Sequence, residues 1–233
     1  MRYVVIDNWE FCPTPWLLSE YAYVAELFGE AVIITNVSDE KMLHTLNNVA
    51  RATELSLQDL LDIEGIPQER VIVLDPSAGE ELSPRDVRRA DVVVIGGIMG
   101  DHPPKGRTRE LISAKTPNAV LRSLGKEQLT IAGSAYVLKK VSGGCDIRDI
   151  DLRFGLSIGL KILDADVITY LPYAFPYERG RPILPRRYLE TVALRSVFFE
   201  GVEVDEACPD KSEEFEHITG SVRMLHIIEA KDS

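Results

Sequence analysis

Cysteine is scarce in this sequence, and long apolar runs are missing. The chain has 233 residues and three cysteines, Cys12, Cys145 and Cys208, which are far apart. We therefore expect neither a disulfide framework nor a cysteine metal site, and a reducing cytosol suits such a chain. No stretch approaches the roughly eighteen consecutive apolar residues of a membrane-spanning helix. The apolar run at residues 4–6 ends at Asp7 and is too short for a signal peptide. These absences predict a cytoplasmic protein with no membrane segment.

Basic residues are outnumbered by acidic ones. The sequence has 26 Lys and Arg against 37 Asp and Glu, a net charge of −11 and a pI near 4.9. Proteins that hold nucleic acid through its phosphates need clustered cations. Two short clusters occur, one at Arg85, Arg88 and Arg89 and the other at Lys105, Arg107 and Arg109. The acidic excess either keeps the protein soluble or indicates a basic partner, and composition alone does not separate the two.

Several catalytic motifs are also missing. The sequence has no His-Glu-x-x-His, Cys-x-x-Cys or Gly-x-Ser-x-Gly pattern. It lacks the Gly-x-Gly-x-x-Gly pattern of dinucleotide folds, and no Walker Lys-Ser/Thr pair follows its glycines. Asp101 and His102 could supply two metal ligands at most. We therefore predict neither a metal site nor a pyrophosphate site.

The hydrophobic pattern that is present alternates between short apolar runs and helical periodicity. The expected strands are 2–6, 31–35, 71–74, 92–95, 119–124, 165–170 and a terminal strand within 223–229. The expected helices are 16–28, 39–50 with Ser38 as N-cap, 56–61, one beginning at Ser83, one from about Thr108, 130–141 and 186–198. Strands that alternate with helices predict an α/β fold with a mostly parallel sheet flanked by helices. We expect one domain over residues 1–200, followed by an acidic segment over 201–233 whose residues 203–216 form a loop or mobile arm.

Unusual residues follow three of the expected strands. These strand ends are residues 74–76, 96–101 and 124–130, and in an open parallel sheet ligands bind beyond such ends. The middle one reads Gly-Gly-Ile-Met-Gly-Asp, and its glycines permit close backbone approach and positive φ. A tight strand-to-helix turn without a ligand explains the spacing equally well.

Longer segments around these loops resemble one known family. They are residues 73–76, 82–84, 95–111, 124–130, 171–173 and 182–185, together with Trp16, Glu20 and Tyr21. Over roughly residues 2–195 the chain resembles a family of SPOUT methyltransferases first described as predicted RNA methyltransferases. That family includes a eukaryotic protein arginine methyltransferase acting on a ribosomal protein. The resemblance implies a deep trefoil knot with S-adenosylmethionine bent inside it.

The resemblance also implies where the cofactor is held. One wall would be Leu74, Asp75 and Pro76, the second Gly96, Gly97, Ile98 and Gly100, and the third Leu124, Gly125, Gln128, Leu129 and Thr130. A protonated guanidinium has no free lone pair, so an arginine target needs a carboxylate to orient it and take a proton. Asp101 and Glu110 are the candidates for that role. Arg107 would either pair with Glu110 or bind the carboxylate of the cofactor.

Three functions remain open from the sequence. The first is a protein arginine methyltransferase acting on a basic partner such as a ribosomal protein, which the acidic charge favours. The second is an RNA methyltransferase, which would require a basic patch near the cofactor site. The third is a non-catalytic binding protein that keeps the fold. Within the resemblance we favour a monomer.

Overall fold

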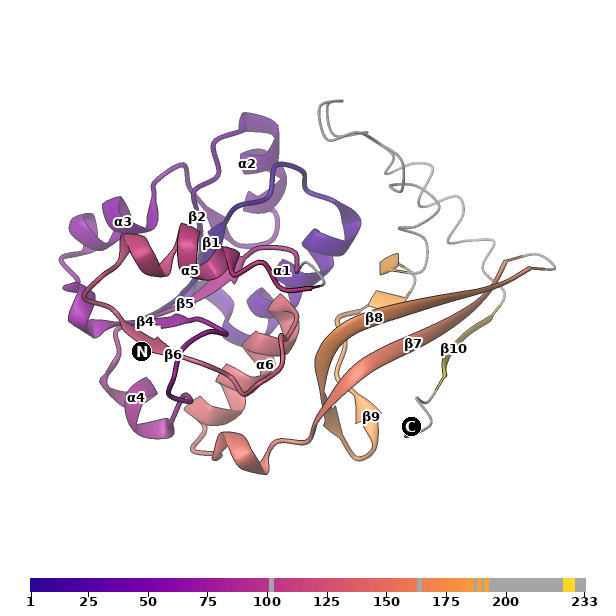
Figure 1. Ribbon diagram of the computed structural model, residues 1–233. Coiled ribbons are helices and arrows are strands. Elements are labelled where there is room, and N and C mark those ends of the chain that lie inside the picture. The colour runs from indigo at the N-terminus through magenta and orange to yellow at the C-terminus, as the bar shows by residue number, and fades with distance from the viewer. Residues whose placement is uncertain (101–102, 163–164, 187, 190, 193–223, 229–233) are drawn as a thin grey trace.

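A computed structural model describes residues 1–100, 103–162, 165–186, 188–189, 191–192 and 224–228 (Figure 1). Its centre is a six-stranded sheet in the order β3-β2-β1-β5-β4-β6, and every pairing in it is parallel. The strands are β1 (Tyr3–Asn8), β2 (Val32–Thr35), β3 (Arg51–Ala52), β4 (Val71–Leu74), β5 (Val92–Gly97) and β6 (Val120–Arg122). The predicted parallel sheet is confirmed. The trefoil knot stays a prediction.

Helices cover both faces of this sheet. They are α1 (Pro15–Phe28), α2 (Glu40–Asn47), α3 (Leu57–Glu64), α4 (Pro84–Arg89), α5 (Arg107–Leu111) and α6 (Ile131–Ser142). Alternate residues of the strands belong to different cores, because successive side chains of a strand point to opposite faces. Val4 and Ile6 pack with α1, α2, α4 and α6, whereas Val5 packs with α3 and Ile112. Both sides of β1, β4 and β5 are thus buried, as expected for uninterrupted apolar strands.

Capping explains where several helices begin. Ser56 and Ser83 each form a capping box with an Asp three residues later, and Thr130 caps α6 by accepting from the N–H of Gly133. Asp39, rather than the predicted Ser38, caps α2, which ends at Asn47. Thr108 does not cap α5, because that helix begins after Gly106 in the left-handed conformation.

A second sheet is antiparallel and was not predicted. Its order is β10-β7-β8-β9, with β7 (Leu152–Ile162), β8 (Ala165–Glu178), β9 (Arg181–Pro182) and β10 (Met224–Ile228). Figure 1 shows the β7–β8 hairpin extending away from the parallel sheet. In residues 152–162 apolar residues alternate with small or polar ones, a pattern that predicts a strand. The glycines at 155 and 159 weaken this prediction, because glycine is unfavourable inside strands. Gly155, at φ +83°, lies at a register shift in the ladder, so it forms a bulge.

The hairpin is attached to the rest of the fold through its own hydrophobic cluster. Trp16 of α1 packs there with Leu171, Tyr173 and Phe175 of β8, together with Tyr188. Tyr188 meets the rings of Trp16 and Phe175 edge-on, with centroids 6.2 and 6.4 Å apart. This cluster sets the hairpin beside α1 and the start of α6.

Some sequence predictions fall on residues outside this description. They are the acidic loop 203–216 and most of the helix expected at 186–198. The terminal strand is observed as β10, paired with β7. Among the described residues no helix is long and apolar enough to cross a membrane.

Cys145 is a free thiol of intermediate exposure. The absence of a disulfide framework and the cytoplasmic location both stay predictions.

The hairpin cluster generates a stability prediction. Phe175 is 1% exposed, whereas Phe154 on the same hairpin is 48% exposed. Phe175→Ala should lower the free energy of unfolding by about 3–5 kcal/mol, because it leaves a cavity against Tyr188. Phe154→Ala should cost under about 1 kcal/mol. Urea denaturation of both variants measures the difference, and equal losses would contradict the packing described.

Candidate functional site

Three strand-end loops meet at one edge of the parallel sheet. β5, β4 and β6 are consecutive in the sheet, so the loops that follow them lie side by side. They enclose a cleft with a volume of about 310 Å³, within the range of small-molecule sites. Its lining comprises Asp75, Pro76, Ser77, Ile98, Gly100, Pro104, Lys105, Gly106, Arg107, Thr108, Arg109, Lys126 and Gln128. The three loops singled out in the sequence thus each contribute residues to one cleft.

The first loop is held by a buried carboxylate. Asp75 is 1% exposed and accepts hydrogen bonds from the Ser77 N–H at 2.8 Å and the Ser77 hydroxyl at 2.6 Å. The Ser113 hydroxyl donates to its other oxygen at 2.6 Å. Asp75 thus shapes the cleft wall through these bonds, and Pro76 lines the cleft next to it. Leu74 is buried in the core instead.

The glycines of the middle loop serve packing more than ligand approach. Gly97 lies directly against β1, where an added Cβ would meet the Asn8 Cα and the Asp7 carbonyl oxygen at 2.9 Å. At Gly96 the nearest atoms would be at 3.4 Å, an ordinary contact. A Cβ on Gly100 would press on the side chains of Gln128 and Tyr173. None of the three has a positive φ, so the left-handed backbone that glycine permits is not used here.

Hydrogen bonds from three other segments hold the middle loop at Met99 and Gly100. The Met99 N–H donates to Glu10 Oε1 at 2.8 Å, and the Arg107 guanidinium donates to the Met99 carbonyl. Arg107 also forms an ion pair with Glu10, with 3.7 Å between Nη1 and Oε1. The Tyr173 hydroxyl donates to the Gly100 carbonyl at 2.5 Å. Glu10 and Tyr173 were not predicted from the sequence.

The third loop is attached to the hairpin. The Gln128 carbonyl accepts from the Ala174 N–H at 2.8 Å, and Leu129 forms an isolated bridge with Ala174. Gly125 has a φ of +110°, a conformation that favours glycine. Leu124 is buried in the core, while Gln128 lines the cleft.

The structure does not bring Arg107 and Glu110 together. Asp101 lies outside the described residues. Arg107 lines the cleft, and among the described carboxylates it pairs with Glu10 and not with Glu110. Glu110 is exposed on α5 and lines neither this cleft nor the pocket beside it. The need for a carboxylate made Glu110 a candidate, and the structure places it on α5 away from both cavities.

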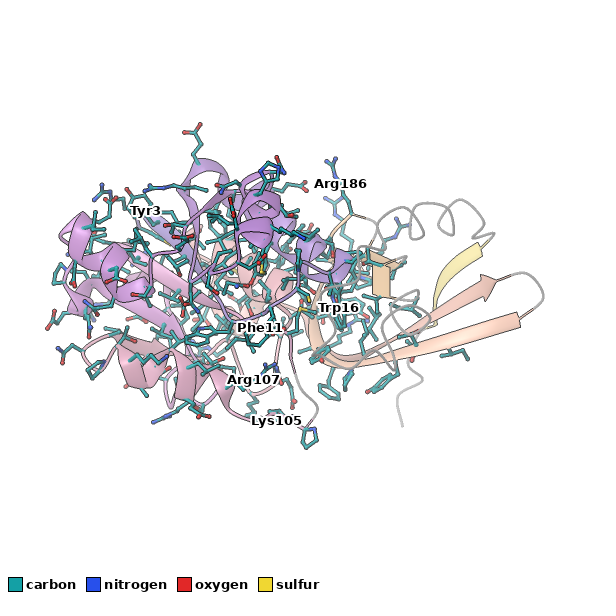
Figure 2. All side chains as sticks on the ribbon, turned by 90° about the horizontal axis from the view of Figure 1, so that it is seen from above. Tyr3, Phe11, Trp16, Lys105, Arg107 and Arg186 are labelled. Atoms are coloured by element: carbon teal, nitrogen blue, oxygen red, sulfur yellow. The ribbon has the colours of Figure 1, made fainter. Side chains whose placement is uncertain are left out.

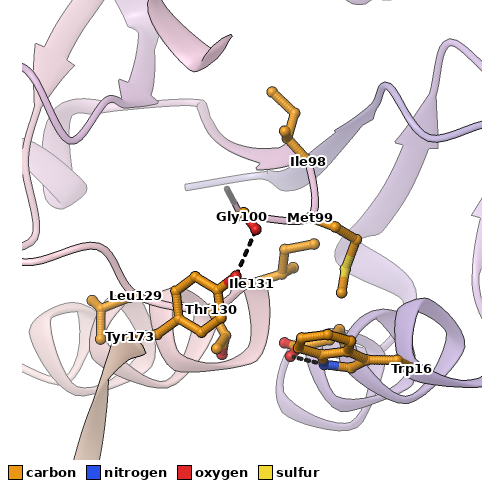
Figure 3. Close-up of a pocket in the computed structure, with 9 residues that line it drawn as sticks. Trp16, Ile98, Met99, Gly100, Leu129, Thr130, Ile131 and Tyr173 are labelled. Atoms are coloured by element: carbon orange, nitrogen blue, oxygen red, sulfur yellow. Dashed lines mark hydrogen bonds between the residues drawn. The ribbon is translucent and has the colours of Figure 1, made fainter. Parts of the chain in front are cut away.

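A smaller pocket adjoins the cleft and shares Ile98 and Gly100 with it (Figure 3). Its volume is about 10 Å³. The other lining residues are Trp16, Glu20, Met99, Leu129, Thr130, Ile131 and Tyr173. Leu129 and Thr130 were predicted for the cofactor wall, and the structure places them here instead of in the larger cleft.

Glu20 is the charged group of this pocket. It is 1% exposed and accepts from the Trp16 indole N–H at 3.0 Å and from the Ala132 N–H at 2.6 Å. Burial raises the pKa of its carboxyl above the ordinary value, although both hydrogen bonds oppose that rise. Trp16 and Glu20 entered the sequence analysis only as part of a resemblance. Their spacing was a signal in the sequence, because residues four apart lie on the same face of a helix and their side chains can form a hydrogen bond.

Cations surround the mouth of the cleft although the chain is acidic. Lys105, Arg107, Arg109 and Lys126 line it, and Asp75 is the one carboxylate among the described lining residues. Figure 2 shows Lys105 and Arg107 near one another on the same side of the molecule. Arg109 donates to the Ser77 hydroxyl at 3.1 Å and so lies against the first loop. Over the described residues no group of three or more His, Cys, Asp or Glu is arranged to hold a metal ion.

The parallel sheet flanked by helices, with a cleft at its strand ends, places the chain in the fold class of the SPOUT-type methyltransferases to which it is structurally similar. The structure of dual-specific Trm10 from Thermococcus kodakaraensis has the same fold, with a TM-score of 0.50, 18% identity, and coverage of 62% of this chain and 95% of that one. That likeness concerns the fold alone.

The chain belongs to the SFM1-like protein arginine N-methyltransferase family, whose model matches residues 3–196. It is 30% identical to protein arginine N-methyltransferase SFM1 of Saccharomyces cerevisiae over 210 residues, which span 82% of this chain and 94% of the yeast protein. A crystal structure of the yeast enzyme complexed with SAM has a TM-score of 0.73 and 26% identity, covering 84% of this chain and 91% of that chain. The complex with SAH has the same TM-score and identity, covering 82% and 94%.

The neighbouring glycines provide a matched test of the packing argument. Gly97→Ala should destabilise the protein by about 1–3 kcal/mol, because the new Cβ overlaps backbone atoms of β1. Gly96→Ala should cause little or no loss. Denaturant unfolding of the two variants compares them, and a loss at position 96 as large as that at 97 would refute the assignment.

Glu20 generates a pH prediction. Its pKa in the folded protein is raised above the ordinary value of 4.5, so folding favours the protonated form. The associated stability is fully present below the unfolded pKa and is lost as the pH rises through the folded pKa. Relative to Glu20→Gln, which does not titrate, the wild type should therefore lose stability with rising pH. Urea unfolding of both proteins from about pH 4 to about pH 8 measures this, and a pH-independent difference would contradict it.

Proposed function

We propose that this chain transfers a methyl group from S-adenosylmethionine to an arginine side chain of a protein. The observation that carries the proposal is the cleft, because three strand-end loops enclose it in a chain of the SFM1-like family. The relatives support both halves of the reaction, since yeast SFM1 is named an arginine methyltransferase and its structures contain SAM or SAH.

The residues of the cleft suit such a methyl donor. Pro76, Gly100 and Gln128 line the cleft, and Gln128 contributes an amide side chain. S-adenosylmethionine supplies a methyl carbon on a cationic sulfur; the arginine nitrogen bonds to that carbon, the carbon–sulfur electron pair stays on sulfur, and one guanidinium proton leaves. Asp101 is our candidate acceptor for that proton, with Glu110 as the alternative. Arg107 holds the loop in place through Met99 and Glu10.

The substrate we favour is a basic protein, such as a protein of the ribosome. A net charge of −11 would attract a basic partner at long range. We also propose that the protein is a monomer and cytoplasmic, as the sequence resemblance and composition suggest.

RNA is the second candidate substrate, and a specific observation favours it. The cations Lys105, Arg109 and Lys126 at the cleft mouth could contact phosphates, in a chain that is otherwise acidic. A non-catalytic binding protein is the third possibility, and it would lack turnover altogether.

Labelled methyl transfer separates these functions. The purified protein and labelled S-adenosylmethionine are added to cell lysate with and without nuclease, and the labelled species are identified. We expect label that persists in protein after nuclease and is recovered as methylarginine. Label confined to RNA would establish the second candidate, and the absence of label despite calorimetric cofactor binding would indicate a binding protein.

The same assay tests the carboxylates. Asp101→Asn should lower turnover at least about a hundredfold while calorimetric binding of S-adenosylmethionine persists. Glu110→Gln serves as the comparison, because Glu110 is exposed outside both cavities. Full activity of both variants would remove both residues from the mechanism.

A further inference from the structure

Glu20 is a buried carboxylate for which the described part of the chain provides no cation. Its two hydrogen-bond donors, the Trp16 indole and the Ala132 backbone, are neutral. No described Lys or Arg contributes to its pKa. Burying a carboxylate without a counter-charge is costly, and such groups are usually paired or perform a function. The position of Glu20 therefore requires an explanation beyond the capping of α6.

The pocket in front of Glu20 has the chemistry of a guanidinium site. Trp16 and Tyr173 provide aromatic surfaces to the pocket (Figure 3), and Glu20 lines the same pocket. A guanidinium is planar, stacks on aromatic rings and donates to carboxylates. The Glu20 carboxylate accepts from the two neutral N–H groups of Trp16 and Ala132, and the hydroxyls of Thr130 and Tyr188 also lie close enough to lower its pKa. The buried Tyr188 hydroxyl approaches Glu20 but makes no hydrogen bond of standard geometry with the described residues.

We propose that this pocket receives the guanidinium of the target arginine and that Glu20 is its anionic partner. The proposal rests on the proposed function. The pocket is placed for it, because Ile98 and Gly100 separate it from the larger cleft and line both cavities. Glu20 is then a binding residue, and the bound guanidinium supplies the positive charge that the surroundings of Glu20 lack. The same ion pair suits the methylated product, which is also a cation.

Entry of a guanidinium requires one side chain to move. A pocket of about 10 Å³ holds a single water at most. Figure 3 shows the Met99 side chain directed toward Trp16 within it. Glu10 and Arg107 hold the Met99 backbone through hydrogen bonds, so only the flexible Met99 side chain would have to move out of the pocket. Met99 thus closes the pocket in the free protein.

Binding should depend on the ionisation of Glu20. The other titratable groups packed against it are the phenols of Tyr21, Tyr173 and Tyr188. Burial raises the pKa of Tyr21 and of Tyr188, so both stay neutral near pH 7. Arginine remains charged throughout. Affinity should therefore rise as the pH increases through the raised pKa of Glu20.

The two tryptophans of the chain allow a direct test by NMR. The Trp16 indole N–H donates to Glu20, whereas the Trp9 indole N–H donates to Asp7 at 2.8 Å, which makes it an internal control. Titration with N-acetyl-arginine amide should shift the Trp16 indole signal and leave the Trp9 signal in place. The citrulline analogue, which is neutral and nearly isosteric, should shift neither. Equal effects of the two compounds, or no shift of Trp16 at tens of millimolar ligand, would overturn the proposal.

Two variants extend the test. Glu20→Gln should weaken the arginine response about tenfold or more and abolish its pH dependence, while Glu26→Gln, at an exposed position on the same helix, should leave both unchanged. If Glu20→Gln does not fold, Met99→Phe fills the pocket without altering Glu20 and should block the response to arginine while calorimetric binding of S-adenosylmethionine persists. A Met99→Phe protein that still responds like the wild type would refute the site.

Turnover distinguishes failure of this proposal from failure of the proposed function. If labelled methyl groups enter protein arginine equally well with wild type and Glu20→Gln, the pocket assignment is wrong and the function stands. If the label enters RNA alone, the function itself is wrong. Loss of arginine methylation in Glu20→Gln with cofactor binding intact supports both.

Discussion

The close approach of β1 and β5 at Gly97 is the constraint on which the site depends. Asn8 and Gly97 are partners in the ladder, and no side chain fits between these strands there. The chain leaves β1 toward Glu10 and leaves β5 toward Met99, so the two segments begin side by side. Glu10 can then accept from the Met99 N–H and pair with Arg107. The middle loop of the cleft therefore takes its position from β1, an element far away in sequence.

Buried carboxylates occur at three places around this edge, and their surroundings differ. Asp7 accepts from Thr35 and Trp9, and Asp75 accepts from Ser77 and Ser113. Those two carboxylates join neighbouring segments through hydroxyl and indole donors. Glu20 also joins two segments, α1 and α6, and it lines the smaller pocket beside the larger cleft. The smaller pocket also has two aromatic side chains in its lining, Trp16 and Tyr173, and this combination of groups is what makes Glu20 a candidate binding group.

Charge is distributed unevenly over the molecule. The net charge is negative, yet the rim of the cleft carries lysines and arginines. The acidic surface can attract a basic partner while the basic rim contacts an anionic group. The two interactions are compatible because, at moderate salt, each charge acts over a distance of only about 10 Å. The Glu20 pocket shares Ile98 and Gly100 with that cleft, so a carboxyl group lies close to the basic rim.

The sequence by itself determined the layered α/β architecture and the three strand-end loops. Apolar runs such as residues 71–74 and 92–95 and capping residues such as Ser56 and Ser83 act locally, and local chemistry is readable from neighbouring residues. The strand expected at 165–170 is part of β8, but β7 and hence the hairpin were missed, because glycines weaken the strand signal of residues 152–162. Only the tertiary structure decided that Arg107 pairs with Glu10, that Glu110 lies outside the cavities, and that Glu20 faces a pocket. Those contacts join residues of separate elements, and their distances depend on how the sheet and helices pack, which no spacing along the chain encodes.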